Sequence, residues 1–193
     1  MNSYNDTSDT QDINSNTKVT SQKEAAIQTY MESVESFVKK LNDGELVGCY
    51  GEVVRELKAR KIITNKNITG ELGEYLVINH YCNTPNLTRL QRAPTGTKNV
   101  DALSTKGDRY SIKTITSKTT GSFYDLEPKG SATKDRQVFE FLIIAILDEN
   151  FVLNKILELG WDDFIKFKTW NSRMNNWNVT VTQKLISEVK NIL

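Results

Sequence analysis

The chain has 193 residues, a formal net charge of +1, 38% hydrophobic residues and two cysteines. This length suits one domain with room for an appendage. Two cysteines are too few for a disulfide framework, and the longest apolar run is about half of what a bilayer-spanning helix needs. The N-terminal segment lacks the apolar stretch of a signal peptide, so we expect a cytoplasmic protein without membrane contact.

Residues 1–20 are polar and of low complexity, which predicts a disordered tail. Residues 21–66 predict an N-terminal helical region. Within it, apolar residues recur at three- and four-residue steps over 21–41, and a second helix is expected over 48–60. Asn42-Asp43-Gly44 is a stop and turn signal between the two helices.

Residues 67–193 predict the main core. A helix is expected from Thr69 to Tyr81, with Thr69 as its N-cap. The sequence then changes to short, β-branched segments that alternate in polarity and predict strands over 87–91, 100–104 and 109–115. The apolar run 138–147 is typical of a central strand that is covered on both faces.

A further strand is expected over 151–158, a short helix over 161–167, and a closing helix over 182–193. The order of helices, then strands, then helices favours an α/β fold with a mixed sheet over a strictly alternating βαβ arrangement.

Asp101 and Lys113 are charged residues inside strand-like sequence, on the two arms of an expected hairpin. The pairing register can bring them to one face of the sheet, where such charges are costly unless they pair or serve chemistry. Phosphodiester hydrolysis is such chemistry, because a carboxylate can hold Mg²⁺ and a lysine can orient the attacking water or offset phosphate charge. The plain alternative is a turn aspartate and a solvent-facing lysine on an edge strand.

A third carboxylate would complete such a site, and the run Gly70-Glu71-Leu72-Gly73-Glu74 offers two. Glu71 and Glu74 are three residues apart and share a helix face. The helix dipole is a sufficient explanation for Glu71, which lies near the helix N-terminus. Glu74 is flanked by apolar residues and a glycine, so we favour Glu74.

A helical glutamate, then Asp101, then Ser111-Ile112-Lys113 resembles the pattern of the PD-(D/E)XK nuclease superfamily, and more narrowly a small bacterial group within it. The resemblance implies a restriction-endonuclease-like core, a central mixed sheet flanked by helices, here with an N-terminal helical extension. It implies that Glu74 and Asp101 bind metal, with Glu71 and Ile112 as further metal positions, and that Lys113 assists the water. Ser111 occupies a catalytic position where the family usually has Asp or Glu.

Basic residues are concentrated around the expected site. Residues 87–136 hold ten basic and five acidic side chains, a balance of +5 in a chain of +1. This concentration suits contacts with the phosphate backbone of DNA. The expected nucleic-acid contacts are Arg89, Arg92, Lys98, Thr116, Ser117 and Lys118.

The sequence therefore leads us to expect a Mg²⁺-dependent endodeoxyribonuclease of restriction or defence type, with Mn²⁺ as a possible substitute. A homodimer is expected, because a twofold assembly suits cleavage of both strands, and residues 21–60 are the candidate interface. Two alternatives stay open: a non-catalytic nucleic-acid-binding or regulatory module on the same fold, to which Ser111 points, and a protein-interaction domain with no nucleic-acid role.

Overall fold

The structure is a computed structural model that describes residues 25–65 and 67–193. The expected tail over residues 1–20 lies outside the described residues. The chain divides into two compact units between Glu56 and Leu57, and each unit is described by itself. Within the described ranges, no helix is long and apolar enough to cross a membrane.

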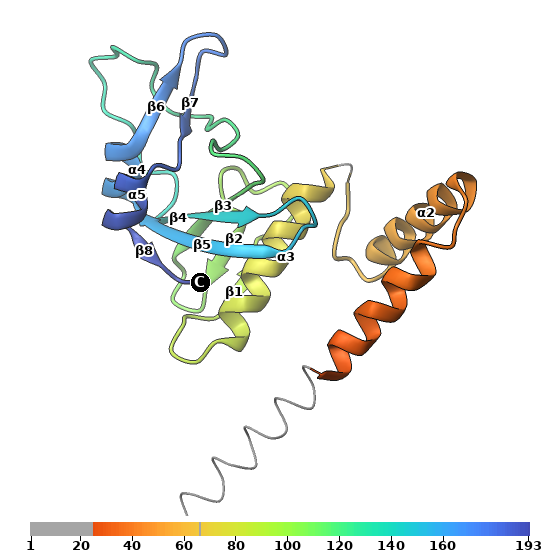
Figure 1. The fold of residues 1–193 in the computed structure, drawn as a ribbon. Helices are drawn as coiled ribbons and strands as arrows, with labels where there is room; N and C mark the ends of the chain where they lie inside the picture. Colours follow the sequence, from red (N-terminus) through yellow and green to blue (C-terminus); the bar gives the residue numbers. More distant parts are fainter. Residues whose placement is uncertain (1–24, 66) are drawn as a thin grey trace, which may run out of the picture. The chain divides into compact units, whose positions relative to one another are not determined.

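The N-terminal unit is helical. One helix covers residues 25–38, and α2 (Asp43–Ala59) follows after a short turn (Figure 1). The predicted break between the two helices is confirmed near Asn42, but the second helix begins at Asp43 and not at residue 48 as predicted. The Asn42 side chain accepts the Glu45 N–H at 3.0 Å and the Glu45 carboxylate accepts the Asn42 N–H at 2.9 Å, so the two form a capping box that begins α2.

The second unit is built on a six-stranded sheet in the order β1-β2-β3-β4-β5-β8, beside a two-stranded sheet of β6 and β7. Only β3 and β4 pair in parallel, so the six-stranded sheet is mixed and the predicted α/β class is confirmed. Its elements in chain order are α3 (Ile68–Asn83), β1 (Leu90–Arg92), β2 (Ala102–Ser104), β3 (Arg109–Ile115), β4 (Phe141–Leu147), β5 (Leu153–Gly160), α4 (Trp161–Phe167), β6 (Lys168–Asn171), β7 (Asn176–Val179), α5 (Gln183–Glu188) and β8 (Lys190–Asn191).

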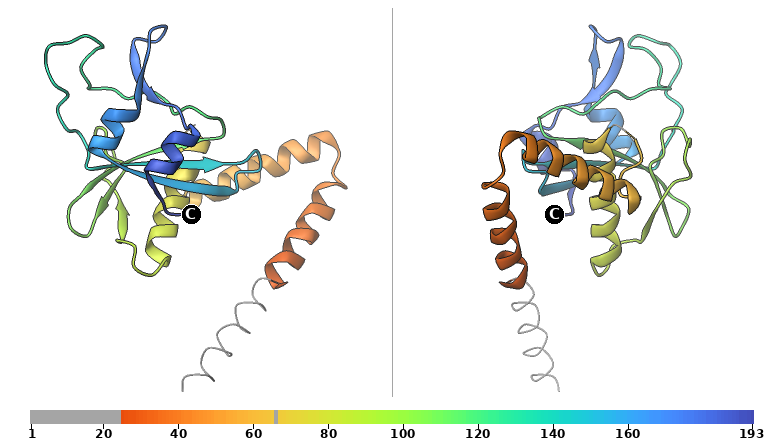
Figure 2. Two further views of the ribbon diagram at one scale, coloured as in Figure 1. Left: turned by 60° about the vertical axis from the view of Figure 1, so that its left-hand side comes forward. Right: turned by 90° about the vertical axis from the view of Figure 1, so that its right-hand side faces the viewer.

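Strand β4 is central, as its apolar run predicts. It pairs with β3 on one side and β5 on the other, and Leu142 to Ala145 are all fully buried. Its side chains alternate between two cores: Ile143 faces the cluster that includes Val77 and Tyr81 of α3, whereas Leu142 faces the cluster that includes Phe164 of α4. Figure 2 shows α3 on one side of the sheet and α4 and α5 on the other.

The C-terminal part differs from the sequence prediction. The closing helix expected over 182–193 ends at Glu188, and the chain continues as β8, which pairs with the edge of β5. Pairing with an open sheet edge supplies backbone hydrogen bonds that a frayed last helical turn would lack. The β6–β7 hairpin was not predicted as strands; Trp170 and Trp177 lie opposite each other in it, with ring centroids 5.1 Å apart.

Candidate active site

The site begins where β2 separates from β3. The two strands pair only at Ala102 and Leu103, and the Asp101 N–H donates to the carbonyl of Tyr110 at 2.8 Å. One residue pair further, the Asp101 carboxylate accepts the Ile112 backbone N–H at 2.7 Å. The side chain thus takes the place of a strand partner, because an unpaired backbone N–H at this position would be costly.

Ser111 supports the same carboxylate. Its side chain is 2% exposed, and its hydroxyl lies 3.3 Å from the Asp101 Oδ2 atom as a donor. Ser111 therefore contributes a neutral hydrogen bond where a second carboxylate would contribute charge.

Helix α3 brings Glu74 to this point. The predicted N-cap at Thr69 was wrong: Asn67 caps the helix, and its side chain accepts the Gly70 N–H. One turn later Gly73 lies against β3 so closely that an added Cβ atom would sit 2.0 Å from the Oγ1 atom of Thr114. The missing side chain lets the helix axis approach the strand, which carries Glu74 to the separation between β2 and β3.

Glu74, Asp101 and Lys113 line one open hollow of about 410 Å³. Glu74 lies on α3, Asp101 directly precedes β2, and Lys113 lies in β3. The structure therefore brings together the three residues that the sequence singles out. Ile112, Thr69, Thr114, Gly121 and Ser122 also line the hollow.

The charges in the hollow are not balanced. Burial and the nearby Asp101 carboxylate raise the pKa of Glu74 to about 7, although Arg92 and Lys113 act in the opposite direction. Arg92 is 3.8 Å from the Glu74 carboxylate, at the outer limit of an ion pair. Two carboxylates in a half-buried hollow repel each other, so the site holds less than its full negative charge at neutral pH in the absence of a cation.

Lys113 is placed to act on a ligand in the hollow. Its Nζ atom lies over the ring of Phe123, a residue of the loop after β3, at 5.1 Å from the ring centroid. Within residues 25–65 and 67–193, no carboxylate lies within 4.0 Å of this ammonium. Its hydrogen-bond donors are consequently available to water or phosphate.

Glu71 is held differently, one turn before Glu74. Its Oε1 atom accepts from the Thr64 hydroxyl and the Asn65 side-chain amide, and its Oε2 atom accepts the backbone N–H groups of both residues. Burial alone would raise the pKa of Glu71, but these hydrogen bonds and the charge of Arg92 lower it below the ordinary value. Four bonds occupy the lone pairs of the carboxylate, so we assign Glu71 to holding the loop before α3.

The residues expected to contact nucleic acid are spread around the site. Arg92 lines a second hollow of about 230 Å³ that it shares with Glu74 and Asp101. Lys98 is exposed beside Arg109 and Arg136 in a separate hollow. The exposed Thr116, Ser117 and Lys118 follow β3 directly, and Arg89 is exposed before β1.

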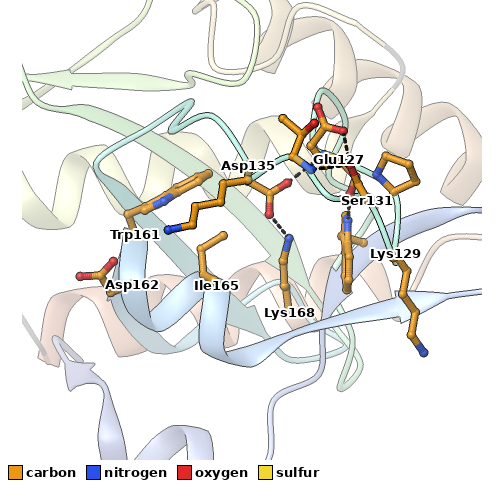
Figure 3. Close-up of a pocket in the computed structure, with 13 residues that line it drawn as sticks. Glu127, Lys129, Ser131, Asp135, Trp161, Asp162, Ile165 and Lys168 are labelled. Carbon is orange, nitrogen blue, oxygen red and sulfur yellow. Dashed lines mark hydrogen bonds and ion pairs between the residues drawn. The ribbon is translucent and has the colours of Figure 1, made fainter.

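A larger hollow lies elsewhere. It measures about 520 Å³ and is formed by the loop 127–135, α4 and β7 (Figure 3). Lys168 extends to Asp135 across it, forming a largely buried ion pair, and lies 4.0 Å from the ring centroid of Trp177. Three lysines and three carboxylates line it, and Asp135 is already paired with Lys168. We therefore take the smaller hollow as the candidate active site.

The metal-binding potential of the site is limited to two carboxylates. Among the described residues, no three His, Cys, Asp or Glu side chains converge in a way that would hold a metal ion. This donor set excludes a structural zinc site but suits Mg²⁺, which commonly takes one or two carboxylates and completes its shell with water and phosphate oxygens.

Sequence reasoning missed the contacts that set this geometry. The Thr64 and Asn65 clamp on Glu71, the Gly73–Thr114 approach and the position of Phe123 below Lys113 all join segments that are distant or irregular in sequence. One signal was present: a glycine inside an otherwise apolar helix indicates a close approach by another element. Comparison with known proteins adds no assignment, since the chain matches no protein-family model and no curated protein.

Proposed function

We propose that the chain is a metal-dependent endonuclease that hydrolyses DNA phosphodiester bonds on a PD-(D/E)XK-like core. One observation carries this proposal: Glu74, Asp101 and Lys113 line the same hollow, and burial together with Asp101 raises the pKa of Glu74 to about 7. A carboxylate with a strongly perturbed pKa in a cleft is a common feature of catalytic sites.

Glu74 and Asp101 would hold Mg²⁺, with the backbone carbonyl of Ile112 as a further oxygen donor. The bound ion would supply Lewis-acid stabilisation of the charge that develops on the phosphate. A cation would also relieve the repulsion between the two carboxylates, which is the physical reason that the hollow suits one.

Lys113 would serve the attacking water and the scissile phosphate. Its ammonium has no carboxylate partner within the described ranges and lies over the ring of Phe123. An ammonium in this position orients the water by hydrogen bonding and offsets negative charge on a phosphate oxygen.

Ser111 is the residue that favours an alternative function without catalysis. Its hydroxyl fixes Asp101 but adds no negative charge, so the cation would be held by two carboxylates instead of three. A site weakened in this way would favour a module that binds nucleic acid without cutting it.

The test is cleavage of a supercoiled plasmid and a long phage DNA with Mg²⁺ or Mn²⁺, with a chelator as the blank. We expect cleavage by the wild type and a loss of at least about 100-fold in Asp101→Ala and Lys113→Ala, which remove a metal ligand and the charge on the water or phosphate. Asp162→Asn and Lys184→Ala change exposed charges outside the hollow and should leave the rate unchanged.

Discrete fragments would indicate sequence-specific cutting, and a smear would indicate nonspecific cutting. Calorimetric titration with Mn²⁺ gives an independent reading, because Asp101→Ala should lose binding whether or not the chain cleaves. Absence of cleavage with both metals, on DNA and on an RNA control, would contradict the proposal and favour the non-catalytic binding module.

A further inference from the structure

The N-terminal helices leave most of their apolar surface uncovered. We call residues 25–59, the helix 25–38 together with α2, the helical pair. No residue of α2 is buried, and neither hydrophobic core cluster includes a side chain of the helical pair. Eight of its large apolar side chains are 44% to 72% exposed: Ile27, Tyr30, Met31, Phe37, Leu46, Val47, Tyr50 and Val53.

These side chains form one stripe on each helix. At about 100° of rotation per residue, the apolar positions of α2 from Leu46 to Leu57 fall within an arc of roughly 120°. The apolar positions from Ile27 to Val38 fall within a similar arc on the preceding helix. A stripe of this width is what a helix presents to a bundle core, but two helices cannot enclose such a core.

We propose that the helical pair associates with the helical pair of a second copy, so that the chain forms a homodimer through a four-helix bundle. Eight large side chains exposing roughly 100 Å² each would bury about 800 Å² per protomer, the contribution of one partner to a standard protein interface. The available area therefore matches what a stable dimer needs.

Charge argues against nucleic acid and an anionic membrane as occupants. Residues 25–59 carry six acidic and four basic side chains, a balance of −2. A net negative surface does not suit duplex DNA or an anionic membrane surface, which attract lysine- and arginine-rich faces.

The choice of a second copy rests on the proposed function. Each chain has one candidate active site, and two such sites related by a twofold axis suit the cutting of both strands of a duplex. Self-association through the helical pair would supply the second site without using the basic surface around Glu74 and Asp101.

The test is the mass of the full chain by sedimentation equilibrium over a range of concentrations. We expect twice the chain mass for the wild type and the mass of one chain for a variant carrying Val47→Glu and Tyr50→Glu, because two charges per protomer would be buried in the bundle. Gly48→Glu is the control for position: it adds one glutamate to the opposite side of α2, where an added side chain meets open space, and should remain a dimer. Circular dichroism of all three proteins checks that the helices and the sheet unit are retained.

A plasmid assay links the assembly to the activity. The double variant should convert supercoiled DNA to nicked circles, whereas the wild type and Gly48→Glu should yield linear DNA. A wild type that sediments as one chain at every concentration overturns the dimer, and so does a dimer that persists in the double variant. Because mass is measured without DNA or metal, failure of the dimer is distinguishable from failure of the nuclease.

Discussion

Two glutamates one helical turn apart have pKa values that are shifted in opposite directions. Glu71 accepts four hydrogen bonds from Thr64 and Asn65, which lower its pKa, whereas burial and Asp101 raise the pKa of Glu74 to about 7. Sequence places both on one helix face near a helix N-terminus. The difference arises from the segments that each meets: a polar loop in one case and a second carboxylate in the other.

The same substitution at these two positions should have opposite effects on the metal-free protein. Because the folded pKa of Glu74, about 7, lies above its ordinary value of 4.5, ionisation costs stability as the pH rises from about 4.5 to 7. Glu74→Gln should therefore increase the free energy of unfolding at pH 8 by at most about 3 kcal/mol, and raise the midpoint of thermal unfolding accordingly. At pH 4 the substitution should change stability little. Scanning calorimetry with a chelator present measures this effect.

Glu71→Gln is the matched control. The folded pKa of Glu71 is lowered, so its ionised form stabilises the fold above pH 4.5 and this contribution is lost as the pH falls through the folded pKa. The amide would also point a donor at donor groups of Thr64 and Asn65, and the loss at pH 7 should be about 1–3 kcal/mol. If both variants shift the midpoint in the same direction at pH 8, the assigned electrostatics are wrong.

At the scale of elements, the site depends on how closely α3 approaches β3. An added Cβ atom at Gly73 would lie 2.0 Å from Oγ1 and 2.7 Å from Cβ of Thr114, both in the centre of the sheet unit. The Oγ1 atom of Thr114 also donates to the carbonyl of Gly70 at 3.3 Å. The glycine and the Thr114 hydroxyl therefore fix how α3 packs against β3, and this packing sets the position of Glu74.

Gly73→Ala should lower the free energy of unfolding by about 1–3 kcal/mol, because the helix must move away from the strand to fit the methyl group. Urea denaturation followed by circular dichroism measures the loss. The double variant Gly73→Ala with Thr114→Ala removes the two nearest atoms and should recover part of it.

A glycine elsewhere provides the control for this change. Gly48→Ala in α2 meets open space and should not destabilise the chain, since alanine has the higher helix propensity. A Gly73→Ala protein as stable as the wild type would contradict the close approach of α3 to β3.

At the scale of the whole molecule, charge is distributed unevenly. The helical pair has a balance of −2, whereas residues 87–136 have a balance of +5 in a chain whose total is +1. Exposed members of the basic segment include Lys98 and Lys118, which lie in loops before β2 and after β3. This separation suits a chain that binds a phosphate backbone with one unit and a protein with the other.

DNA binding should therefore be strongly salt-dependent. In a fluorescence anisotropy titration without divalent metal, Lys98→Ala and Lys118→Ala should each weaken binding and reduce the slope of log affinity against log salt by about 0.9, because each removes one phosphate contact. Lys184→Ala removes an exposed lysine on α5 and should leave the slope unchanged. Binding that does not vary with salt would contradict the proposed role of the basic segment.

The sequence by itself determined the local elements and the chemistry-bearing residues. Hydrophobic periodicity is a local property, so it located the buried strand β4, the helix α4 and the mixed α/β class, and the charged residues in strand-like sequence singled out Asp101 and Lys113. The tertiary structure decided the rest. It made the Asp101 carboxylate accept the Ile112 N–H where β2 leaves β3, and it bound Glu71 to a loop while Glu74 lines the hollow. It also paired the last residues with β5. Such features depend on contacts between segments that are distant in sequence, and their energies come from the partner that each group meets in the folded chain rather than from its neighbours along it.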